Sequence, residues 1–160
     1  MSKYLRKIRN QLNKVKKEGG DILSFLKNIF GENGERAVVF SSRFRELIDL
    51  ILDNIEDPEE NRETVRYLYK LASQMGYEGI MYLTAQIADR VPYEELQCNL
   101  KSYIDETVKE IIISKVDEML NGELWERKAL AIILPSLKKN LPRSRIFNIV
   151  QRLLIDDSIE

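Results

Sequence analysis

The cations that could bind an anion gather in the stretch SLKKNLPRSRIF, residues 136–147: Lys138, Lys139, Arg143 and Arg145. Asn140 is a typical helix N-cap and Pro142 suits a first turn, so both arginines should lie near the positive end of a helix dipole. A phosphate or an acidic side chain would compensate by meeting several cations and free N–H groups at once. An exposed cation costs only about 0.3 to 1 kcal/mol there, so a solvated turn without a ligand fits equally well.

This cluster is part of a longer basic segment. Residues 127–152 hold seven cations and no acid. Its other members are Arg127, Lys128 and Arg152. Residues 1–20 hold seven cations and one acid. Those seven are Lys3, Arg6, Lys7, Arg9, Lys14, Lys16 and Lys17. Residues 21–126 hold 11 cations and 22 acids, so the chain is basic towards both ends and acidic between them. This segregation bears on partners more than the net charge of −1 does.

Three interpretations compete for the first basic segment. A membrane-surface helix would have its cations, but Tyr4 is the only interfacial aromatic residue there. A nucleic-acid-binding helix would have charge without a recognisable reading motif. An ordinary helix would pack its apolar stripe on the domain and expose its cations to water. We favour the last, because lysine on an amphipathic helix usually serves solvation.

Residue types exclude most familiar catalytic sites. The chain has no histidine, which rules out Ser-His-Asp and Cys-His catalysis and the Glu-x-x-His di-iron site in their usual forms. None of the seven glycines forms a GxGxxG or GxxxxGK phosphate loop. The single cysteine excludes an internal disulfide and every multi-cysteine metal site. We therefore expect no enzyme activity, no cofactor and no metal.

One enzymatic alternative survives, because carboxylates alone can hold Mg²⁺. The stretch EENRE, with Glu59, Glu60 and Glu63, resembles the EExxE half of the all-α nucleotide pyrophosphohydrolases. The ExxD partner of that family should follow it, yet Glu46 and Asp49 precede it. A solvated acidic turn at a helix N-terminus is the preferred interpretation.

Two further residues carry alternatives. Cys98 lacks an activating histidine, so it is expected to be a small core residue beside Leu96 and Leu100. Trp125 is expected to anchor the core, with a hot spot for a partner as the lesser alternative.

Helical periodicity organises almost the whole chain. Leu5, Ile8, Leu12 and Val15 make one apolar stripe on a first helix that ends at Gly19 and Gly20. Asp21 should cap a second helix, and a long third helix should run to about Ile55. Further helices are expected around Gly76, Pro92 and the NGE stretch at 121–123. No segment has the alternation of a half-buried strand, so the fold class is all-α.

The expected domains are a basic amphipathic helix at residues 1–20 and one helical domain at residues 21–160. Residues that interrupt helices recur in the second domain at intervals of about 30 residues, at Asn61, Pro92 and Gly122, and this spacing is typical of helical repeats. The stretch EDPEENRETVRYLYKLA, with Asp57 and Pro58 in its turn, resembles the start of a HEAT repeat. LAIILPSL resembles the kinked first helix of such a repeat, with Pro135 at the kink. The resemblance covers residues 46–155 at most.

This resemblance implies a HEAT-like right-handed solenoid, a curved binding scaffold without an active site. An irregular bundle of about seven to eight helices is the alternative. The function expected first is a non-enzymatic module that binds another protein, as an adaptor or assembly subunit. The alternative is a nucleic-acid-binding subunit that contacts backbone phosphates through residues 1–17 and 127–152. Self-association stays open. A membrane partner is disfavoured, and the single cysteine together with the lack of a signal-peptide pattern predicts a cytoplasmic protein.

Overall fold

The described part of the chain is helical throughout. The computed structural model describes residues 2–55, 61–91, 96, 100–101 and 103–155, and these residues contain no strand. The all-α prediction is confirmed. Nine α-helices and two 3-10 helices lie within these ranges: α1 Lys3–Lys17, α2 Ile22–Phe30, η1 Glu35–Arg43, α3 Phe44–Leu52, α4 Arg62–Ser73, α5 Tyr77–Ala88, α7 Glu106–Ser114, α8 Val116–Leu120, α9 Leu124–Ile133, η2 Leu134–Leu137 and α10 Arg143–Ile155.

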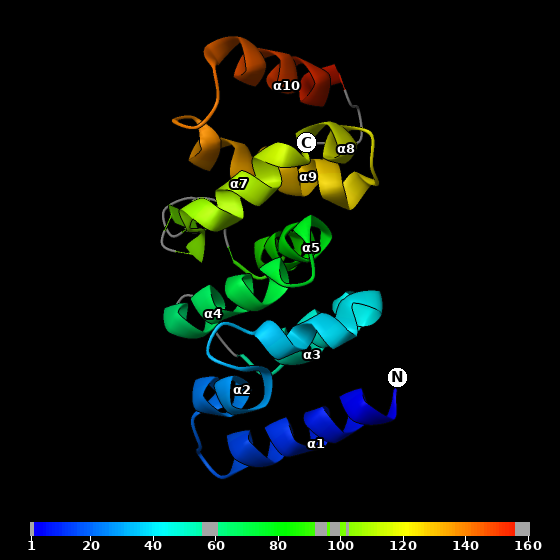
Figure 1. Ribbon diagram of the computed structural model, residues 1–160, viewed down its shortest axis with the longest axis vertical. Coiled ribbons are helices and arrows are strands. Elements are labelled where there is room, and N and C mark those ends of the chain that lie inside the picture. Colours follow the sequence, from blue (N-terminus) through cyan, green and yellow to red (C-terminus); the bar gives the residue numbers. More distant parts are fainter. Residues whose placement is uncertain (1, 56–60, 92–95, 97–99, 102, 156–160) are drawn as a thin grey trace.

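The helices form an elongated stack with α1 at one end and α10 at the other (Figure 1). Helices α1, α3, α5 and α9 contact one another in succession and make one layer, which we call layer A. Helices α2, α4 and α7 contact one another in the same way and make layer B. Successive helices of the chain therefore alternate between the two layers from one end of the stack towards the other. The helical-repeat hypothesis requires such an alternation, while the HEAT-type resemblance itself stays a prediction.

Local sequence explains how the first two helices are bounded. The Ser2 side chain accepts a hydrogen bond from the Leu5 amide at 3.2 Å and caps α1. Leu5, Ile8 and Leu12 are buried, as their spacing predicts. The chain leaves α1 through Gly19 at φ +72°, a conformation that suits glycine. Asp21 caps α2 by accepting from the Leu23 amide.

Buried apolar side chains form one cluster that extends from Leu5 in α1 to Leu153 in α10. Polar groups within it are paired between helices. The Tyr67 hydroxyl of α4 donates to the carbonyls of Leu26 and Gly31, at 3.2 and 2.7 Å, and so ties α4 to the end of α2 within layer B. No helix in the described ranges is both long and apolar enough to cross a bilayer.

Two helix predictions are wrong in detail. The expected long third helix is divided, since η1 is a 3-10 helix and α3 begins only at Phe44. The β-branched and serine residues of AVVFSS disfavour an α-helix, and the Ser41 hydroxyl bonds the Val38 carbonyl instead. Asn140 does not cap α10, which begins at Arg143. Its side chain donates to Glu106 at 3.2 Å, a contact between distant segments that local sequence does not reveal.

The proline of the predicted kink lies in a short 3-10 helix. The α-helix α9 ends at Ile133, and η2 continues it with Pro135 near its start. Proline cannot donate the hydrogen bond that would continue the α-helix. Of the other residues that carry the resemblance, Asp57, Pro58 and Pro92 lie outside the described residues.

Candidate partner-binding surface

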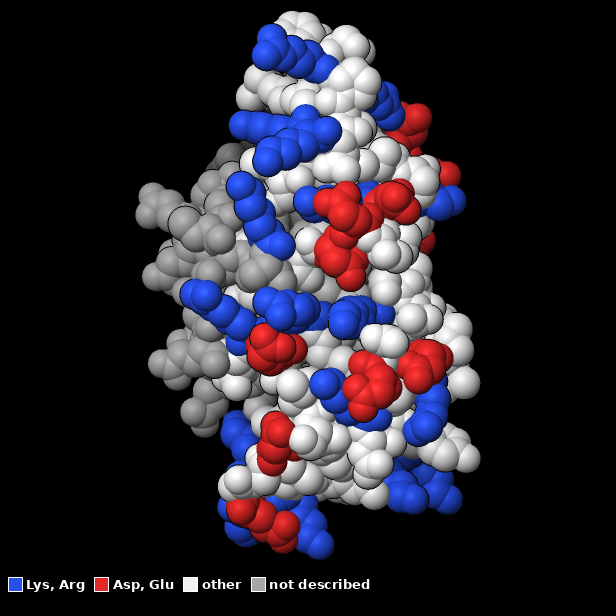
Figure 2. Space-filling view, turned by 60° about the vertical axis from the view of Figure 1, so that its left-hand side comes forward, with Lys and Arg blue, Asp and Glu red and all other residues white. Residues whose placement is uncertain are grey.

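The two basic segments do not converge in space. Helix α1 carries the first and lies at one end of the stack, whereas the second lies on α9, on the loop after η2 and on α10, towards the other end (Figure 1). Figure 2 shows lysine and arginine side chains along the whole of one face, with acidic side chains set between them. The cations of this face therefore form no unbroken basic stripe.

The first basic segment faces acidic residues of its neighbour in layer A. A groove of about 920 Å³ separates α1 from α3. Its α1 wall carries Arg9, Lys16 and Lys17, and its α3 wall carries Glu46, Asp49 and Asp53. The two walls have opposite charge, so α1 is attracted to the acidic middle of the chain. The remaining cations predicted for this segment are exposed: Lys3, Arg6, Lys7 and Lys14. Of these, Lys7 borders an apolar concavity together with Tyr4 and Val39.

The second basic segment is divided. Arg145 donates to Asp117 of α8 at 2.6 Å, so a residue of the chain itself compensates this cation at the start of α10. Arg127 donates to the Gly122 carbonyl. Lys128 and Arg143 are exposed. Lys138 and Lys139 lie apart from these, beside Lys101 and Lys109.

A cluster that the charge pattern does not reveal lies on layer A. The Arg45 guanidinium carbon lies 5.7 Å from the ring centroid of Phe44, 5.6 Å from that of Tyr82 and 5.1 Å from that of Trp125. Tyr82 meets Phe44 and Trp125 edge to face, with interplanar angles of 86° and 90°. We call these four residues the arginine cage. They come from α3, α5 and α9, three successive helices of one layer.

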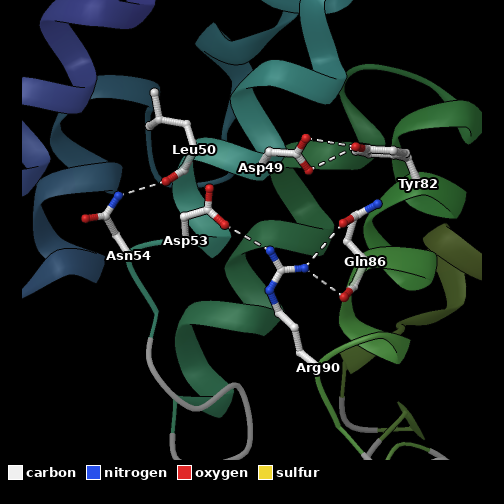
Figure 3. Close-up of polar contacts among 7 residues, drawn as sticks. All are labelled: Asp49, Leu50, Asp53, Asn54, Tyr82, Gln86 and Arg90. Carbon is white, nitrogen blue, oxygen red and sulfur yellow. Dashed lines mark hydrogen bonds and ion pairs between the residues drawn. The ribbon is translucent and has the colours of Figure 1, made fainter.

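Two acidic residues at the edge of the arginine cage bind its side chains. Glu123 accepts from the Trp125 indole and lies 3.4 Å from an Arg45 nitrogen. The Tyr82 hydroxyl donates to Asp49, with both carboxylate oxygens at 2.9 Å, as Figure 3 shows. The side chain of Arg45 is nevertheless 48% exposed, and the three rings are partly exposed. The arginine cage is thus a fixed surface that a partner can reach.

A second polar link joins the same helices close by. Arg90, just beyond α5, donates to Asp53, the residue after α3, at 3.0 Å and to the Gln86 carbonyl at 2.9 Å, and it lies between the two helices in Figure 3. The Asn54 amide donates to the Leu50 carbonyl at 2.8 Å at the end of α3. These contacts fix the groove and the arginine cage relative to each other.

Burial perturbs the two groups that join the groove to the arginine cage. Desolvation raises the pKa of Asp49, although the hydrogen bond from Tyr82 opposes this shift. Burial raises the pKa of Tyr82 to about 12, and the hydrogen bond to Asp49 adds to the rise. At neutral pH the Tyr82 hydroxyl therefore keeps its proton and donates a hydrogen bond to Asp49.

The described residues do not support the alternative of a metal site built from carboxylates. Glu59, Glu60 and the lone Cys98 lie outside the described residues. Glu63 pairs with Arg66 of its own helix at 3.1 Å. Within the described ranges, no group of three or more Asp, Glu or Cys side chains comes close enough to hold a metal ion.

Sequence reasoning considered Trp125 as a hot spot but missed its companions. Phe44 and Arg45 are adjacent in sequence, yet nothing local connects them with Tyr82 or Trp125. Only the succession of α3, α5 and α9 brings the four together. Chemically, the surface offers aromatic faces and a held guanidinium, which favour contact with another macromolecule. None of the family models, curated proteins or solved structures compared with this chain matches it.

Proposed function

We propose that this chain is a non-enzymatic module that binds another protein, as an adaptor or assembly subunit. The observation that carries the proposal is the arginine cage. Aromatic residues and arginine are enriched at the centres of protein interfaces and dominate their energetics. Here the contacts among Arg45, Tyr82 and Trp125 already hold the side chains in place, so binding would cost little additional side-chain entropy.

The separation of the two basic segments supports a protein partner over nucleic acid. A nucleic-acid backbone is bound by a continuous stretch of cations, and affinity then falls steeply with salt. In this chain α1 faces acids of α3 across the groove, and Arg145 is paired with Asp117. The nucleic-acid alternative predicts a mobility shift at about 50 mM salt. The absence of a shift there would remove it.

The proposal includes a scaffold role for layer A. If the chain is a HEAT-like repeat, as residues 46–155 resemble, one layer of helices would present a continuous binding surface. The arginine cage spans three helices of layer A, which is consistent with such a surface. The cytoplasm is the proposed location, because a single cysteine fits a reducing compartment.

The test compares capture by the wild-type chain with capture by Arg45→Ala and Trp125→Ala. Each immobilised protein is exposed to a lysate of its source cells, and bound proteins are quantified by mass spectrometry. We expect one or a few proteins to be enriched by the wild type and reduced at least tenfold by both variants, as hot-spot losses of about 2 kcal/mol predict.

Lys128→Ala is the matched control, because it removes one exposed cation from α9 outside the arginine cage. It should retain the captured proteins. Capture that both cage variants leave unchanged would contradict the proposed surface. A wild-type chain that captures nothing would contradict the proposed function.

A further inference from the structure

A small pocket lies where the start of α7 meets η2 and the loop after it. Its volume is about 350 Å³, at the lower end of the range for small-molecule sites. Four lysines line it: Lys101, Lys109, Lys138 and Lys139. We call it the lysine pocket. It lies on elements other than the α3, α5 and α9 helices of the arginine cage, so a ligand there would not depend on the proposed function.

Among the described residues that line the lysine pocket, the one acid is already engaged. Glu106 accepts from the Lys109 ammonium at 3.3 Å and from the Asn140 amide at 3.2 Å. It therefore braces the loop after η2 against the start of α7. Its charge offsets at most one of the four lysines, so the described residues of the lining keep an excess of three positive charges.

The other three lysines have no partner among the residues that the structure describes. Lys101, Lys138 and Lys139 make no ion pair or hydrogen bond from their side chains within the described part of the chain. Cations elsewhere do find partners, as Arg90 does in Asp53 and Arg145 in Asp117. Three unpaired ammonium groups around one concavity repel each other and raise the local positive potential.

We propose that the lysine pocket binds a small ligand that carries a diphosphate or triphosphate group. Lysine is a common phosphate ligand and acts as a point charge. A single phosphate ester carries roughly −1.5 to −2 at pH 7, so two phosphoryl groups match three unpaired lysines better than one does. The Ser136 hydroxyl and the Asn140 amide also line the pocket and add neutral donors.

Calorimetry on the full chain at low salt tests this with inorganic pyrophosphate, inorganic phosphate and sulfate as probes. We expect one pyrophosphate per chain and affinity at least tenfold above that for sulfate. The double variant Lys138→Ala/Lys139→Ala should weaken pyrophosphate binding at least tenfold. ADP in place of pyrophosphate shows whether the organic part of the ligand contributes: tighter binding identifies a nucleotide-type ligand, and equal binding identifies the diphosphate alone.

The charge-matched control is Lys14→Ala/Lys128→Ala, which removes two exposed cations that do not line the lysine pocket. It should bind pyrophosphate as the wild type does. Glu106→Gln should bind more tightly, because it removes the only acid among the described lining residues and releases Lys109. Equal weakening by the two double variants, or no heat with pyrophosphate, would overturn the proposal. So would an oligonucleotide that binds when pyrophosphate does not, since that outcome indicates an extended phosphate-backbone site.

Discussion

The arginine cage and the lysine pocket treat positive charge in opposite ways. Arg45 lies over three aromatic rings and beside Glu123, so the chain itself satisfies this cation. Lys138 and Lys139 have no such partner within the described residues. A cation that the fold satisfies contributes to stability, whereas an unpaired one leaves its interaction energy available to a ligand. Mutations at the two places should therefore separate stability from binding.

The largest expected effect is on the aromatic side of the arginine cage. Replacing Trp125 with Ala removes a ring that contacts both Tyr82 and Arg45. Because Trp125 is only partly buried, we expect a loss of about 2 kcal/mol in the free energy of unfolding, below the 3 to 5 typical of a buried aromatic. Urea denaturation measures it. A loss under about 0.5 kcal/mol, the range of ordinary surface changes, would mean that the arginine cage does not stabilise the fold.

Replacing Arg45 should have a smaller effect. We expect Arg45→Ala to cost about 1 kcal/mol, since exposed cation–π contacts contribute roughly 0.5 to 1 kcal/mol. Arg45→Lys keeps the charge but loses the planar group that stacks on the rings, so it should recover only part of this loss. The same denaturation experiment compares the three proteins. Full recovery by lysine would show that charge near Glu123, and not stacking, holds the arginine cage together.

At the lysine pocket we expect no loss of stability. Lys138→Ala/Lys139→Ala should change the free energy of unfolding by at most about 0.5 kcal/mol, and towards greater stability, because it relieves repulsion. This gain should vanish at about 1 M salt, where the Debye length is about 3 Å. Thermal unfolding at low and high salt measures it. A clear destabilisation would show that these lysines have a structural role, which would erase the contrast with Arg45.

The smallest effect concerns pH at the edge of the arginine cage. Tyr82 has a pKa of about 12 in the folded chain, against 10.0 for its ordinary value. Folding disfavours its phenolate, so its contribution to stability is unchanged below pH 10 and is lost progressively as pH rises towards 12. Tyrosinate absorbance titrations of the wild type and Tyr82→Phe should differ by one group that ionises near pH 12. A difference centred near pH 10 would mean that Tyr82 is not held as described.

Periodicity predicted the helices well because it reports burial directly. The spacing of Leu5, Ile8 and Leu12 encodes one buried face, and the structure buries all three. The division of the third helix was missed because a helical apolar pattern fits a 3-10 helix over a few turns nearly as well. Only the two valines before Phe40 and the serines after it hint at the difference.

The two candidate sites were less accessible to sequence reasoning. Lys138 and Lys139 were singled out by local charge, but their grouping with Lys101 and Lys109 depends on how η2 meets α7. Asn140 was assigned to a cap by local preference, and a contact with distant Glu106 prevailed. Such pairings arise from tertiary contacts, which a single sequence does not encode in any local pattern.

The alternation of helices between two layers has a consequence for how the chain folds. Most contacting helices are next to each other or two apart in their order along the chain, although α5 also packs extensively on the more distant α9, so most of the loops that must close are short. Structure of this kind forms and melts locally, so α10 can detach while α1 to α4 remain folded. The folded state of different helices would then have different lifetimes. Hydrogen exchange would show amide protection that changes gradually along the stack.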